Sequence, residues 1–181
     1  MKDKDKDKDK VIACLKQIGL KVDPDNFDDR LIIQKIVYLL KIKGLNIGYY
    51  YGTPYFEKRG VYSKELADDY CNNAPEFRGL VTNYALKEDE YEIIDEFRSI
   101  FDISIPLLEA GTTYAYFAYE MGMDPSEAYN KTKEIKSQYC TPYEIAIGVS
   151  NVKQFVFDPM EEDKEVLERE IELWQVGGVH G

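Results

Sequence analysis

The stretch FDDRLIIQKIVYLLKIKG, residues 27–44, decides the fold of this chain. Asp28 and Asp29 open it, and Lys43 and Gly44 close it, which is the order that the helix dipole and a C-terminal glycine cap favour. Among its Leu, Ile and Val residues runs one narrow polar stripe: Arg30, Gln34, Tyr38 and Lys41. A helix that is apolar around most of its girth lies inside a core. We therefore predict a central helix over residues 28–43.

The residues that follow change in character. Residues 47–56 contain three consecutive tyrosines, followed by Gly52 and Pro54, and have little helical periodicity, which favours a strand or an extended segment. Residues 80–86 form a second run of this kind, and pairing of the two would give a small β element. The predicted fold class is mainly α (α+β): a compact multi-helix domain around the central helix 28–43 with a small two-stranded β element.

Apolar spacing and capping residues predict the other helices. Helices are expected over about 10–18, 64–73, 87–102 and 107–121. Three further helix starts have an N-cap residue, a proline and a later glutamate, in the sequences DPSE at 124–127, TPYE at 141–144 and DPME at 158–161. Helices should therefore begin near residues 125, 142 and 159.

The two ends of the chain differ from its middle. Lys and Asp alternate through residue 10, so a helix there would stack like charges four residues apart, and we expect a disordered tail over 1–10. Residues 177–181, GGVHG, are expected to be a flexible tail. Between them, residues 11–176 are predicted to form a single helical domain, since 181 residues suit one core.

Composition excludes several kinds of chemistry. The only histidine, His180, lies in the C-terminal tail, which disfavours histidine-dependent nucleophilic, general-base and zinc sites. Cys14, Cys71 and Cys140 have no CxxC spacing and are interpreted as small buried thiols. The acidic clusters lack EF-hand spacing. We therefore expect no catalytic residues, no metal site and no cofactor, and hence a protein that is not an enzyme.

Charge and hydropathy restrict the partners. The formal net charge of −11 disfavours nucleic acid and suits a basic protein partner. No apolar run reaches the roughly 20 residues that a membrane helix needs, and the N-terminus lacks the apolar region of a signal peptide. We expect no membrane partner and a cytoplasmic location.

The sharpest local motif is RGVYS, residues 59–63. Its glycine permits positive φ, and Ser63 suits a helix N-cap. Arg59 next to the start of a helix, together with Ser63, is a candidate anion-binding pair. A structural turn, with Arg59 paired to Asp68 or Asp69, is the alternative interpretation of the same residues.

Two of these motifs together resemble a known family. Residues 27–39, FDDRLIIQKIVYL, followed some twenty residues later by RGVYS, resemble the Panacea family, the domain of SocA-type antitoxins and phage-associated proteins, and its archaeal and bacillary relatives. The later positions that match are Glu109, Tyr114, Glu127, Ala128, Lys131 and Lys133. The resemblance implies a mainly helical domain that acts by protein binding, without a cofactor, in antitoxin or proteolytic-adaptor roles. Val61 stands where the turn of that family has a proline.

Three functional hypotheses follow. The leading one is a non-catalytic protein–protein interaction module that binds a toxin or a protease component through an acidic, tyrosine-rich surface. Its candidate contact residues are Tyr51, Tyr55, Arg59, Tyr62, Asp68 and Asp69. The alternatives are a helix-turn-helix-type nucleic-acid-binding regulator that uses residues 107–138, and an anion- or nucleotide-binding protein that uses Arg59 and Ser63. A homodimer formed through exposed tyrosines is compatible with all three.

Overall fold

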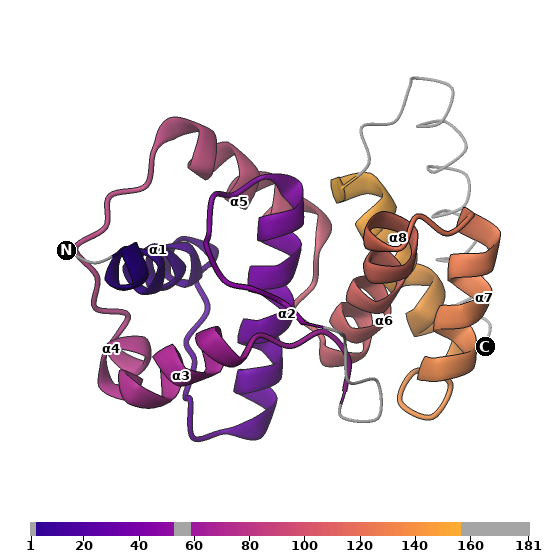
Figure 1. Ribbon diagram of the computed structural model, residues 1–181, viewed down its shortest axis with the longest axis horizontal. Coiled ribbons are helices and arrows are strands. Elements are labelled where there is room, and N and C mark those ends of the chain that lie inside the picture. The colour runs from indigo at the N-terminus through magenta and orange to yellow at the C-terminus, as the bar shows by residue number, and fades with distance from the viewer. Residues whose placement is uncertain (1–2, 53–58, 157–181) are drawn as a thin grey trace. The chain divides into compact units, whose positions relative to one another are not determined.

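A computed structural model describes residues 3–52 and 59–156, and the chain divides after Ser99 into two compact units. The first unit contains α1 (Asp3–Ile18), α2 (Phe27–Lys43), α3 (Lys64–Asn72), α4 (Ala74–Gly79) and most of α5 (Glu88–Ile100) (Figure 1). The second contains α6 (Ile105–Ala115), the π-helical turn η2 (Tyr116–Glu120), α7 (Pro125–Lys136) and α8 (Pro142–Val156). The single helical domain over residues 11–176 stays a prediction, since part of that range lies outside the described residues. The expected tail at 177–181 and helix start at 159 lie outside the described residues.

The prediction of a central helix is confirmed by α2. Its apolar positions Ile33, Ile36, Leu39 and Leu40 are fully buried, and each such side chain stabilises the fold by about 1.5–3 kcal/mol. The side chain of Asn26 caps its start by accepting the Asp29 N–H at 3.1 Å.

The expected disordered tail over residues 1–10 differs from the structure, in which α1 begins at Asp3. The reason is tertiary. Lys10 is 5% exposed; its Nζ donates to the Asn46 carbonyl at 2.8 Å and lies 3.1 Å from a Glu90 carboxylate oxygen. The carboxylate of Asp7 accepts the N–H of Gly48 at 3.2 Å. These contacts supply what the alternating Lys and Asp sequence lacks as an isolated helix.

The predicted two-stranded β element is not present: the described residues contain no strand, only one isolated bridge residue, Gly60. Backbone polar groups near a core must still find partners. Along residues 46–49 those partners are side chains of the helices, because Lys10 binds the Asn46 carbonyl, Asp7 binds the Gly48 N–H and Lys41 binds the Tyr49 carbonyl. Helix side chains therefore replace the expected ladder of a neighbouring strand.

The second unit is organised by close packing of α6 on α8. A Cβ atom added to Gly148 would lie 2.5 Å from the Leu107 carbonyl oxygen, and one added to Gly111 would lie 2.9 Å from the Gly148 carbonyl oxygen. The predicted starts of α7 and α8 are confirmed. At α8, Thr141 and Glu144 form a reciprocal capping box with distances of 3.1 and 2.9 Å.

Within residues 3–52 and 59–156, no helix is both long and apolar enough to cross a membrane.

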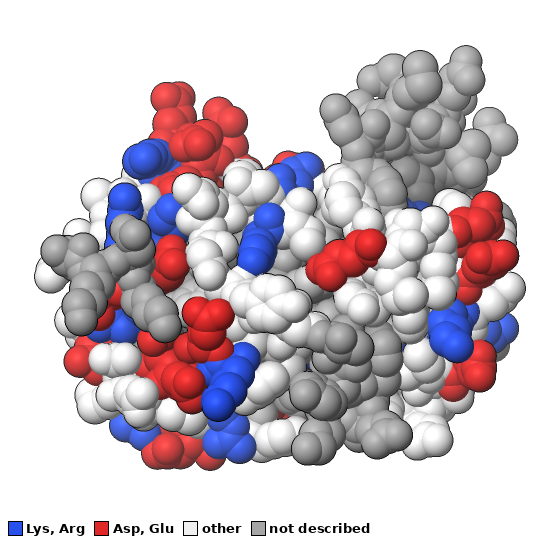
Figure 2. All heavy atoms as spheres, viewed as in Figure 1, with Lys and Arg blue, Asp and Glu red and all other residues white. Residues whose placement is uncertain are grey.

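Acidic side chains gather over α5, as Figure 2 shows, and the exposed ones include Glu88, Asp89, Glu92 and Asp95. Of the three cysteines, Cys14 and Cys140 are buried as expected, whereas Cys71 is exposed.

Candidate functional site

The candidate site is the turn at residues 59–63, which lies against the polar stripe of α2. Arg59 and Gly60 both have positive φ, at 85° and 96°. Glycine adopts such angles freely, but an arginine rarely does. The turn therefore needs support from its surroundings to keep this shape.

Lys35 gives the first part of that support. It is 2% exposed, and its Nζ donates to the carbonyl oxygens of Arg59, at 2.5 Å, and Val61, at 3.1 Å. A buried ammonium group is costly unless polar partners surround it. The turn is therefore fixed by an internal lysine as well as by its glycine.

Gln34 gives the second part. Its amide nitrogen donates to the Ser63 carbonyl at 2.8 Å, and its amide oxygen accepts the Ser63 N–H at 2.8 Å. The Ser63 hydroxyl in turn accepts the Leu66 N–H at 3.3 Å and so caps α3, as the sequence predicted. Ser63 is fully buried. Its N–H, carbonyl and hydroxyl groups all have partners inside the protein.

Two tyrosines brace the extended segment before the turn. The Tyr51 ring meets the Tyr38 ring edge-on at 5.1 Å, and its hydroxyl donates to the Gln34 carbonyl at 3.1 Å. The Tyr49 hydroxyl donates to the Asp69 carboxylate at 2.5 Å. Burial raises the pKa of Tyr51, and burial followed by the hydrogen bond to Asp69 raises the pKa of Tyr49. Both hydroxyls therefore stay protonated donors.

Side chains of the turn and of the two neighbouring helices form what we call the Tyr62 surface: the exposed Phe27 and the partly exposed Arg30 of α2, Tyr62 of the turn, and the exposed Asp68 and Cys71 of α3. Tyr62 is 42% exposed and Phe27 is 52% exposed. Partial burial, followed by the nearby Asp68 carboxylate and Cys71 thiol, raises the pKa of Tyr62, and Arg30 acts in the opposite direction. The Arg30 guanidinium also lies 5.7 Å from the centre of the Phe27 ring. Arg30 thus links the two aromatic side chains.

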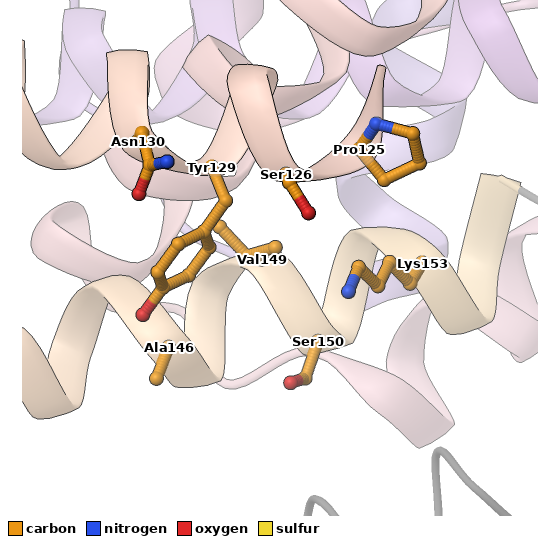
Figure 3. A pocket seen from close by; sticks show the side chains of 8 residues that line it. All are labelled: Pro125, Ser126, Tyr129, Asn130, Ala146, Val149, Ser150 and Lys153. Atoms are coloured by element: carbon orange, nitrogen blue, oxygen red, sulfur yellow. The ribbon is translucent and has the colours of Figure 1, made fainter.

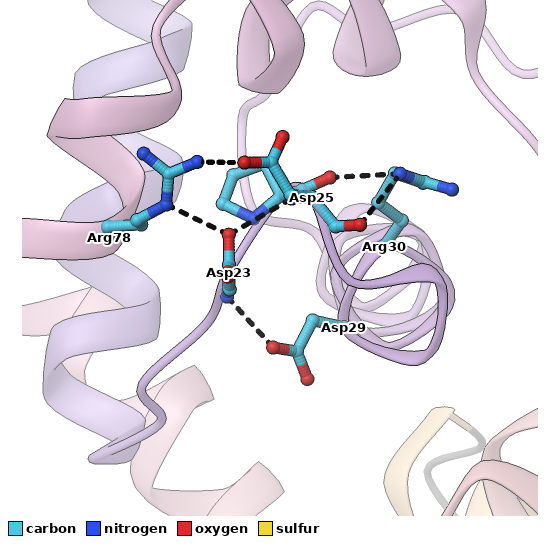
Figure 4. Close-up of polar contacts among 6 residues, drawn as sticks. Asp23, Asp25, Asp29, Arg30 and Arg78 are labelled. Carbon is cyan, nitrogen blue, oxygen red and sulfur yellow. Dashed lines mark hydrogen bonds and ion pairs between the residues drawn. The ribbon is translucent and has the colours of Figure 1, made fainter.

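A polar network fixes the loop before α2 and with it Arg30 (Figure 4). Arg30 donates to the Pro24 carbonyl at 3.1 Å, and the Asp23 N–H donates to the Asp29 carboxylate at 2.8 Å. Arg78 of α4 binds the carboxylates of Asp23, at 2.9 Å, and Asp25. The Asp25 N–H and the Arg78 guanidinium hold the pKa of Asp23 below its usual value. The loop is tied to both α2 and α4.

The predicted contact residues have different places in this arrangement. Tyr62 and Asp68 lie on the outer face, whereas Tyr51 and Asp69 hold the segment from within. Arg59 is partly exposed at the turn, and Tyr55 lies outside the described residues.

Sequence reasoning missed Phe27, Arg30 and Cys71 as surface neighbours of Tyr62. The sequence signal for Arg30 was its place at the start of the polar stripe of α2. The structure shows why this mattered: the next residue of the stripe, Gln34, binds Ser63, which follows Tyr62.

The segment proposed for nucleic-acid binding, residues 107–138, is only partly exposed. Lys131 and Lys133 lie on the surface. Lys136 is fully buried, with its Nζ 3.8 Å from a carboxylate oxygen of the equally buried Glu109. One of the three lysines of α7 is therefore part of the interior.

Comparison with family models, curated proteins and solved structures finds no match to this chain.

Proposed function

We propose that this protein is a non-catalytic interaction module that binds a basic protein partner through the Tyr62 surface, in the manner of an antitoxin or a proteolytic adaptor. The observation that carries the proposal is the support behind this surface. Gln34 and Lys35 bind the backbone of residues 59–63 from inside, so Tyr62 is presented on a turn that is already shaped. A surface that is ordered before binding loses less conformational entropy when a partner docks.

The chemistry of the surface suits a protein partner. Exposed Tyr62 and Phe27 offer aromatic contact area, and aromatic residues are enriched where proteins bind one another. The exposed Asp68 stands beside them in a chain of net charge −11. A partner with lysine or arginine opposite Asp68 would be steered by that charge and held by the aromatic rings.

Capture of the partner from lysate by the full chain tests the proposal. Tyr62→Ala and Asp68→Lys should each reduce recovery of the same bound protein, with a loss of at least about tenfold in affinity for Tyr62→Ala if it acts as a hot spot. Asp69 is a poor choice for charge reversal, because its carboxylate accepts the buried Tyr49 hydroxyl and its loss would disturb the fold.

Matched controls distinguish specific binding by this surface from nonspecific effects of an exposed tyrosine or of net charge. Tyr143 of α8 is 40% exposed, close to the value for Tyr62, and Glu92 of α5 is exposed like Asp68. Tyr143→Ala and Glu92→Lys should leave capture unchanged. If the controls weaken capture as much as the Tyr62 and Asp68 variants, the assigned surface is wrong. Capture of the same chain alone would indicate a homodimer in place of a foreign partner.

A further inference from the structure

A cavity in the second unit, apart from the Tyr62 surface, has the chemistry of a ligand site. It lies between α7 and α8 and measures about 350 Å³, within the range of small-molecule pockets. Figure 3 shows the side chains that line it, which come from both helices and are partly polar and partly apolar. The lining residues are Pro125, Ser126, Tyr129, Asn130, Ala146, Val149, Ser150 and Lys153.

Lys153 supplies a positive charge to this cavity. It is partly buried and forms no ion pair with any described residue; its one recorded partner is the Tyr114 ring, whose centre lies 5.9 Å from Nζ. Figure 3 shows the Lys153 amine and the Ser126 hydroxyl pointing toward the space between the two helices. The charge of Lys153 is available to a ligand.

Ser150 adds a second, independent observation. It is only 4% exposed and lines the cavity, yet its hydroxyl makes no hydrogen bond to another residue in the described ranges. The Ser150 hydroxyl is not fully enclosed by protein atoms, so it is open to water or to a ligand in the cavity. Ser150 lies one helical turn from Lys153 on α8, so the two side chains serve the same part of the cavity.

We propose that this cavity binds a small molecule bearing an oxyanion, either a carboxylate or a phosphate group. Lys153 provides the cation, and the hydroxyls of Ser126 and Ser150 donate hydrogen bonds. Ala146 and Val149 also line the cavity and offer apolar contacts to the carbon skeleton of the ligand. Asp124 caps α7 by accepting the Ser126 N–H at 2.9 Å, so its negative charge lies near the rim and opposes anion binding.

Amide chemical shifts of the full-length chain, titrated with inorganic phosphate or with acetate at constant ionic strength, test this proposal. The amides of Ser126 and Ser150 should shift saturably with at least one of the two probes, and the tighter probe identifies the group that the site prefers. Lys153→Met should weaken that probe at least about tenfold, the size expected for one charged hydrogen bond. Lys153→Arg should retain binding.

Two further variants make the test specific. Lys133→Met removes an exposed lysine of α7 and should leave binding unchanged. Asp124→Asn should tighten binding, because asparagine caps a helix as well as aspartate but carries no charge. The proposal is overturned if neither probe saturates, if Lys153→Met binds like the parent chain while circular dichroism shows both folded, or if Asp124→Asn weakens binding.

Discussion

Single polar residues inside the first unit determine the shape of its surface. Lys35 is the clearest case, because one buried ammonium group binds two carbonyls of a turn whose Arg59 has positive φ. Buried lysines are rare unless paired. Here the pairing is with backbone, which couples the core helix directly to the turn at residues 59–63.

Replacing Lys35 by methionine keeps the length of the side chain but leaves the carbonyls of Arg59 and Val61 without this donor. Unfolding by urea should show a loss of about 2–3 kcal/mol in stability, the cost of leaving buried acceptors unsatisfied. Lys16→Met, at an exposed position of α1, should change stability by less than about 0.5 kcal/mol. Equal stability of the Lys35→Met variant and the parent would show that Lys35 does not hold the turn.

The folding stability of the first unit depends on pH through Glu90. Burial opposes its ionised form, but the Lys87 N–H, the Tyr84 hydroxyl and Lys10 outweigh that effect and lower the pKa of Glu90 below 4.5. The same network gives Cys14 a pKa of about 12, through burial first and the Glu90 charge second. Because the pKa of Glu90 is lower in the folded chain, its stabilisation is present above pH 4.5 and is lost as the pH falls through the folded-state pKa.

Glu90→Gln should therefore cost about 3 kcal/mol at pH 7, since it leaves the buried Lys10 without its carboxylate. Below pH 4.5 the difference from the parent chain should shrink, because the parent then loses the charge as well. Urea unfolding at several pH values between 3 and 7 measures the effect. Glu92→Gln, at an exposed position of the same helix, is the control, and a gap independent of pH would contradict the assignment.

At the scale of elements, the second unit depends on how closely α6 approaches α8. Helix propensity favours replacing a helical glycine by alanine by about 1 kcal/mol. At Gly148, however, an added Cβ would lie only 2.5 Å from the Leu107 carbonyl oxygen, so Gly148→Ala should lower the stability of the fold. We expect a loss of about 1–3 kcal/mol from overpacking, measured by thermal or urea unfolding. Asn151→Ala on the same helix should be nearly neutral, and a stabilised Gly148→Ala variant would show that the helices are not in this close contact.

For the molecule as a whole, the excess of acidic residues predicts that association with the proposed basic partner depends on salt concentration. With a net charge of −11, the association rate with a basic partner should fall as salt rises from about 50 to 300 mM, while the dissociation rate changes little. Surface plasmon resonance with the captured partner measures both rates. Asp68→Lys should reduce the slope of the association rate against salt. A rate that does not depend on salt would show that the acidic surface takes no part in the encounter.

The sequence by itself determined the helices. The spacing of apolar residues and the capping residues predicted α2, α3, α5 and the starts of α7 and α8. These signals are local, such as Ser63 or Thr141 at an N-cap and a glycine after the last turn of a helix. The choice of Tyr62 and Asp68 as contact residues stays a prediction; both side chains are exposed, and the Asp68 charge acts on Tyr62.

The tertiary structure alone decided the rest. The sequence showed a polar stripe on α2 but not its partners. In the structure Lys41 binds the Tyr49 carbonyl, Tyr38 packs on Tyr51 and Gln34 binds Ser63, and these contacts take the place of the expected strand pairing. The charged segment at residues 3–10 is helical because its side chains bind groups that are distant in sequence: Asn46, Gly48 and Glu90. The cavity beside Lys153 likewise joins residues of two helices. Local sequence cannot show which distant group satisfies a polar side chain, and here those distant partners decide which residues face inward and which remain available to bind.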